Sequence, residues 1–249
     1  MKEVTLYELQ TQGADNGIFI MNMALAGLVL LVIGDSHMVS QGYLISSLHE
    51  SLVSQQAIVH SYGACGVNAG DWVYGTSSTC GQAERHERGA PRIDYSSKAK
   101  GWTVRELIER HRPDLIVVQM GDTMAGYGQS TLPNAWIYGK VRALTTAIRA
   151  QNVSCMWVGP PWGSGGRYEK TTARVKEMSR YLSQVVSPCT YIDSTALARP
   201  GEWPTIDGQH LTASGYRAWG KSIAGSIVGL SGQGQPRTQG RPTASVARR

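Results

Sequence analysis

Hydrophobic positions along the chain form short runs that alternate with longer amphipathic segments. Five runs have the length and apolar content of buried strands, at residues 28–33, 57–62, 114–120, 153–159 and 190–193. Helix-like spacing of apolar residues covers residues 38–55, 102–111, 136–151, 169–186 and 212–228. Five strands that are each followed by a helix predict a mainly parallel sheet with helices on both faces, because right-handed crossovers place them there. The expected fold class is α/β, a three-layer α/β/α sandwich of about five parallel strands, with long connections at residues 63–101 and 195–210.

Composition favours one globular domain followed by a basic tail. The 249 residues are 41% hydrophobic and 17% charged, which is typical of a chain that buries a proper core. The net charge is +6, but four of those charges lie in the last twenty residues, which contain no acid. The remaining charges are evenly mixed, so we expect no nucleic-acid partner. Residues 27–229 are predicted to be the domain, and residues 230–249, which lack apolar periodicity, a disordered tail.

The amino-terminal segment has some features of a leader. Its longest apolar run, residues 17–33, is interrupted by Asn22 and is shorter than the roughly 20 residues of a membrane-spanning helix, so we expect no integral membrane span. Residues 24–26, Ala-Leu-Ala, are typical of a signal cleavage site, but three acidic residues precede them. Residues 1–26 are therefore interpreted as an N-terminal leader or extension.

The four cysteines lack the close Cys-x-x-Cys spacing of a zinc site. Cys155 and Cys189 lie near the starts of two successive predicted strands, where a bridge is feasible if the strands are neighbours. We expect disulfides Cys65–Cys80 and Cys155–Cys189, and hence a periplasmic or secreted protein. Four buried thiols in a cytoplasmic protein remain the alternative.

Polar and glycine-rich segments follow the predicted strands at the edge where a doubly wound sheet forms its site. They are residues 34–37, 61–66 and 121–124, after the first three strands, and residues 207–210, before the last helix. Together they contain the groups that acyl transfer requires. Ser36 needs a base, His210 can remove its proton, and Asp207 can orient the imidazole. Backbone amides of Ser36 and Gly63, with a polar side chain after the third strand, can stabilise an oxyanion.

These blocks, in this order, resemble those of the SGNH hydrolases, also called GDSL esterases or lipases. Gly34-Asp35-Ser36 matches the nucleophile block, Gly63 the glycine block and Asp207-x-x-His210 the final block, and the match covers most of residues 28–229. The resemblance implies a flavodoxin-like α/β/α fold and a triad of Ser36, Asp207 and His210. It implies no cofactor and no metal.

One block departs from the family pattern, which has Gly-x-Asn-Asp after the third strand. Here Thr123 stands at the Asn position, and its hydroxyl can donate one hydrogen bond, so we assign it to the oxyanion hole with Ser36 and Gly63. Asn68 or Asn134 as a substitute donor, and Gly66 in place of Gly63, remain open.

The predicted function is that of a serine esterase acting on a small-molecule or glycan ester. A short acyl group such as O-acetyl on a carbohydrate is favoured, because the loops contain several tryptophans and few long apolar stretches. Two alternatives remain: an O-acyltransferase with the same triad, or a catalytically inactive carbohydrate-binding domain. The glycine-rich residues 159–166 lack both nucleotide-binding fingerprints, and the spacing of the acids and histidines in the site does not demand a metal.

Overall fold

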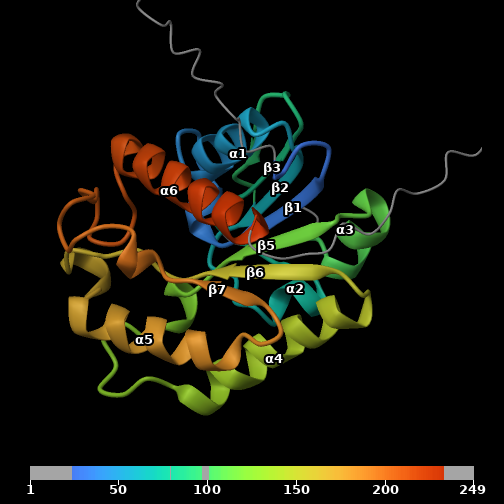
Figure 1. Cartoon of the computed structure of the whole chain (residues 1–249). Helices are drawn as coiled ribbons and strands as arrows, with labels where there is room; N and C mark the ends of the chain where they lie inside the picture. The colour runs from blue at the N-terminus through green and yellow to red at the C-terminus, as the bar shows by residue number, and fades with distance from the viewer. Residues whose placement is uncertain (1–23, 79, 97–100, 233–249) are drawn as a thin grey trace, which may run out of the picture.

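The computed structural model describes residues 24–78, 80–96 and 101–232, so most of the predicted leader and tail lies outside the described residues. Its centre is a seven-stranded sheet with the order β4-β3-β2-β1-β5-β6-β7 (Figure 1). The strands are β1 Val29–Gly34, β2 Ile58–Ala64, β3 Gln82–His86, β4 Arg92–Asp94, β5 Leu115–Gln119, β6 Ser154–Val158 and β7 Thr190–Ile192. All neighbouring pairs are parallel except β2–β3 and β3–β4.

Helices cover both faces of the sheet, which explains why the central strands are apolar throughout rather than alternating. Helices α1 (Leu44–Ser54) and α6 (Ala213–Gly232) pack together on one face (Figure 1). The other face is covered by α2 (Asp71–Tyr74), α3 (Val104–His111), α4 (Asn134–Ala150) and α5 (Thr172–Val185). In β1, Leu31 and Ile33 pack in the core beneath α2 to α5, and Leu30 and Val32 pack in the core beneath α1 and α6.

The expected three-layer α/β/α class is confirmed, and the five expected strands correspond to β1, β2, β5, β6 and β7. The antiparallel pair β3–β4 was not expected, since residues 63–101 were interpreted as a connection. Its first strand reads Gln-Ala-Glu-Arg-His, which lacks the alternation that identifies a strand. Hydrogen bonding to the outer edge of β2 makes this segment extended.

Two helix boundaries also differ from the expectation. The helix expected from residue 38 begins at Leu44, because Ser36–Met38 form a 3-10 turn and Gly42 has a φ of +85°. Helix α6 continues to Gly232, past the predicted domain boundary at residue 229. The remainder of the predicted tail lies outside the described residues.

Both expected disulfides are present. Cys65–Cys80 joins the end of β2 to the segment before β3, with a Cα–Cα distance of 5.4 Å. Cys155–Cys189 joins β6 to the residue before β7 across 4.6 Å, and these two strands are neighbours as the pairing required. In the described part of the chain, no helix combines the length and apolarity needed to cross a bilayer.

Candidate active site

The turn after β1 presents Ser36 at the carboxyl edge of the sheet. Asp35 caps this turn, because its Oδ1 accepts a hydrogen bond from the His37 amide at 3.1 Å. The turn packs closely on the sheet: a Cβ at Gly34 would lie 2.6 Å from Met38 Cγ, so a larger residue does not fit. Ser36 is therefore held with only 8% of its surface exposed.

The three residues of the predicted triad form one hydrogen-bonded chain. His210 Nε2 lies 2.8 Å from Ser36 Oγ, and His210 Nδ1 lies 2.7 Å from Asp207 Oδ2. The other oxygen of Asp207 accepts the amides of Gln209 and His210, which fixes the carboxylate. Partial burial would raise the pKa of Asp207, but the hydrogen bonds from His210 and Gln209 lower it below 3.8. An ionised Asp207 requires the proton on His210 Nδ1, which leaves Nε2 free to accept the serine hydroxyl.

Ser36 and His210 line a pocket of about 500 Å³. Its walls come from the Cys65–Cys80 disulfide, from the segment after β5 and from the segment before α5. The other lining residues are Gly66, Asp122, Thr123, Gly126, Tyr127, Arg167, Tyr168, Glu169 and Gln209. Most of these residues are polar or glycine, although apolar atoms make up most of the surface that they expose to the pocket.

Of the two glycines considered for the oxyanion hole, the structure brings Gly66 to the pocket and leaves Gly63 outside its lining. Gly63 lies within β2 opposite Gly34, and a Cβ there would lie 2.9 Å from the backbone of Met38. Gly66 follows β2 with a φ of +79°, a conformation that suits glycine.

The Thr123 hydroxyl is buried at the pocket and has no hydrogen-bond partner among the described residues. The side chain of Asn68 is engaged elsewhere, because it donates to Asp71 and accepts from the Gly70 amide. Asn134 begins α4 and, like Asn68, does not line the pocket. Thr123 is therefore the pocket residue after β5 whose buried hydroxyl has no partner in the described part of the chain.

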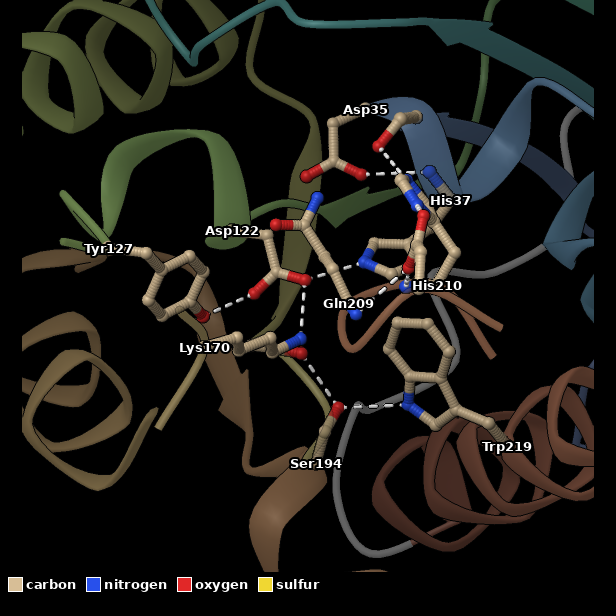
Figure 2. Close-up of polar contacts among 12 residues, drawn as sticks. Asp35, His37, Asp122, Tyr127, Lys170, Ser194, Gln209, His210 and Trp219 are labelled. Carbon is tan, nitrogen blue, oxygen red and sulfur yellow. Dashed lines mark hydrogen bonds and ion pairs between the residues drawn. The ribbon is translucent and has the colours of Figure 1, made fainter. Parts of the chain in front are cut away.

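A buried charged network is centred on Asp122, the residue that precedes Thr123. Asp122 accepts hydrogen bonds from His37 Nε2 at 2.6 Å, Lys170 Nζ at 2.5 Å and Tyr127 Oη at 2.6 Å (Figure 2). Burial would raise the pKa of Asp122, but Lys170 and the hydrogen bonds lower it well below its ordinary value. Burial lowers the pKa of His37 to about 4, so its ring is neutral at neutral pH. Its Nδ1 then accepts the Tyr216 hydroxyl at 2.7 Å.

Sequence reasoning missed this network. Lys170 lies in a segment interpreted as an amphipathic helix, where a lysine is normally solvated, yet it is fully buried and lies just before α5. No local pattern distinguishes it from the other lysines of the chain. Asp35 lies beside the same network, and burial, with the Asp122 charge, raises its pKa to about 7.

Comparisons with known proteins found one relative in sequence and several solved structures with a similar fold. No family model matches the chain. It is 43% identical over 208 residues to Protein BcsX of Komagataeibacter xylinus, covering 82% of this chain and 78% of that one.

Two solved structures share the fold at low sequence identity. A GDSL-like lipase from Bacteroides thetaiotaomicron has a TM-score of 0.53 and 11% identity over 84% of this chain and 94% of its own. A carbohydrate esterase family 3 protein from Talaromyces cellulolyticus has a TM-score of 0.53 and 15% identity, and the match covers 84% of this chain and 100% of that one. These likenesses confirm the architecture that the motif blocks implied.

Proposed function

The chain belongs to the family of Protein BcsX and has the SGNH hydrolase fold, and from these two findings we propose that it is a serine esterase. It would cleave an acyl ester through an acyl-enzyme on Ser36. The observation that carries this proposal is the hydrogen-bonded chain from Ser36 through His210 to Asp207, at 2.8 and 2.7 Å. These are the distances that nucleophile activation requires.

In the proposed reaction, Ser36 Oγ attacks the ester carbonyl while His210 Nε2 takes the serine proton. Asp207 stabilises the imidazolium that forms. The backbone amides of Ser36 and Gly66 and the hydroxyl of Thr123 donate to the developing oxyanion, with Gly66 replacing Gly63 because it lines the pocket. His210 then protonates the leaving alkoxide, and water, activated by the same histidine, hydrolyses the acyl-enzyme and restores Ser36.

We propose a short acyl group on a carbohydrate as the substrate class, on grounds that differ from the sequence argument. The tryptophans that suggested a carbohydrate do not support it: Trp72 and Trp157 are fully buried, and no tryptophan lines the pocket among the described residues. Tyr127 and Tyr168 line the pocket instead. Tyr168 lies edge-on to His210, with ring centroids 5.8 Å apart, and is partly exposed. A partly exposed aromatic ring beside polar groups suits a sugar ring.

We also place the protein in the periplasm or outside the cell. Two disulfides account for all four cysteines, and such bonds persist in oxidising compartments.

The test is hydrolysis of p-nitrophenyl acetate, butyrate and octanoate by the purified chain, beside Ser36→Ala and His210→Ala. We expect activity that falls with acyl length and is lost in both variants. A fluorophosphonate probe should label Ser36 covalently, and labelling should disappear in Ser36→Ala. Product analysis with a sugar acceptor present distinguishes hydrolysis from acyl transfer. An unlabelled Ser36, with rates equal to those of the variants, would refute the proposal and favour an inactive carbohydrate-binding domain.

A further inference from the structure

Three of the six histidines form a cluster outside the Ser36 pocket. His60 in β2 lies directly opposite His86 in β3, and His111 is the last residue of α3. One ring nitrogen from each residue can be chosen so that all three lie within 4.8 Å of one another. The Nδ1 atoms of His60 and His86 are 3.1 Å apart. None of the three lines the candidate active-site pocket.

The sheet and the helix together bring these residues to one place. Side chains alternate across β2, so His60 and Tyr62 share the face that α3 covers, while Val59 faces α1 and α6. An antiparallel partner directly opposite points to the same face, which places His86 beside His60. The end of α3 then sets the ring of His111 4.0 Å from that of His60.

The contact between His60 and His86 leaves a lone pair on one of the two rings. A direct contact between two Nδ1 atoms requires that one carries a proton and the other does not. A metal ion would take the place of that shared proton and accept a lone pair from each ring, so binding releases the proton.

Two further contacts resemble the outer partners that orient metal-binding histidines. Tyr62 Oη and His111 Nε2 share a hydrogen bond of 2.7 Å, and the Glu84 carboxylate lies 3.7 Å from His86 Nε2. A carboxylate or hydroxyl on the far nitrogen fixes the ring and raises its basicity. The Arg110 charge acts against a cation here, and Glu84 and Glu87 act for it.

We propose that His60, His86 and His111 bind one divalent transition-metal ion of the class that neutral imidazole prefers, with Zn²⁺ as the leading member and water in the remaining position. Nitrogens around tetrahedral Zn²⁺ are roughly 3.3 Å apart, given Zn–N bonds of about 2.0–2.1 Å. The spacing of the cluster brackets this value. The stacked rings of His60 and His111 must turn to point at one ion, and all three side chains are only partly buried, which allows that turn and gives the ion an entry path.

Such an ion would join β2, β3 and α3 at the outer part of the sheet. It takes no part in the proposed ester chemistry, so either proposal can fail without the other. No metal was expected from the cysteines or from the acids and histidines near Ser36, and these three histidines, which are more than twenty residues apart, follow no spacing motif.

The experiment uses the full chain without a polyhistidine tag, freed of metal with a chelator and dialysed. We expect one equivalent of Zn²⁺ to bind in calorimetry and to raise the melting temperature, with reversal by EDTA. Co²⁺ as a second probe should give the visible absorption of a nitrogen-ligated tetrahedral ion. His86→Gln and His111→Gln should each lose the binding and the thermal shift, while Glu84→Gln should weaken binding about tenfold.

The control is His210→Ala, which removes the triad histidine and should bind Zn²⁺ as the unaltered chain does. The melting temperature of each metal-free variant shows whether it is folded. Binding that survives in both His86→Gln and His111→Gln, or that disappears in His210→Ala, would overturn the proposal. A variant that does not fold would also lose binding, so the unaltered chain provides a second test. A Co²⁺ complex of the unaltered chain without the tetrahedral absorption band would overturn the proposal.

Discussion

Replacing Thr123 with valine should lower the rate of catalysis without lowering the stability of the fold, because it removes a single hydroxyl group. The substitution keeps the shape of the side chain and removes only the hydroxyl, whose oxygen is buried at the pocket without a partner among the described residues. In the proposed mechanism this hydroxyl meets its partner only when the oxyanion forms. The variant should therefore lose turnover while its fold is unharmed.

The expected changes in kcat and in the free energy of unfolding follow from the state of this hydroxyl with and without the oxyanion. Loss of one oxyanion donor costs about 10²- to 10³-fold in kcat, or roughly 2.7–4 kcal/mol. A buried hydroxyl without a partner costs the folded state about 1–3 kcal/mol, so Thr123→Val should raise the free energy of unfolding by an amount within that range. KM should change little, because the interaction is absent from the ground state.

The assay is kcat and KM for p-nitrophenyl acetate, with the melting temperature measured on the same samples. Thr123→Ser, which keeps a hydroxyl, is the matched control and should retain far more activity than Thr123→Val. An undiminished kcat in Thr123→Val would show that this side chain is not an oxyanion donor. A melting temperature that falls in parallel with activity would show instead that the hydroxyl has a structural partner in the folded protein.

Three further predictions concern the triad, a disulfide and a buried acid. Asp207→Asn should lower kcat about 10⁴-fold with little change in the melting temperature, because His210 loses the anion that sets its tautomer; a loss below tenfold would contradict this. Cys155→Ala with Cys189→Ala opens a link of sequence separation 34 and should lower the free energy of unfolding by about 2–4 kcal/mol in urea titrations, and an unchanged midpoint would be evidence against it. Asp35 has a folded pKa of about 7, above its ordinary 3.8, so its contribution to stability is present below pH 4 and is lost as the pH rises through 7. Relative to Asp35→Asn, the unaltered chain should lose up to about 4 kcal/mol between pH 4 and 7.5, and parallel pH profiles of the two proteins would refute the burial argument.

The architecture was accessible from the sequence wherever burial produced a pattern. Strands covered on both faces are mainly apolar, and so β1, β2, β5, β6 and β7 were recognisable. The edge pair β3–β4 is mostly polar, and its extended form depends on hydrogen bonds to β2, which no local signal reveals.

The arrangement of Ser36, His210 and Asp207 was also accessible from the sequence, for two different reasons. Asp207 and His210 are three positions apart, so their hydrogen bond is almost a local property of the loop. Ser36 and His210 are 174 positions apart, but the rule that parallel strands end at one edge brings them together once the strand order is inferred.

By itself, therefore, the sequence predicted the layered sheet, the disulfide partners and the hydrogen-bonded arrangement of Ser36, His210 and Asp207. Only the tertiary structure decided that Gly66 rather than Gly63 lines the pocket, that Lys170 is buried against Asp122, and that three distant histidines meet. The physical reason is that hydrophobic periodicity indicates which positions along the chain are buried. It does not report which polar group lies opposite, because that contact depends on the packing of elements far apart in the chain.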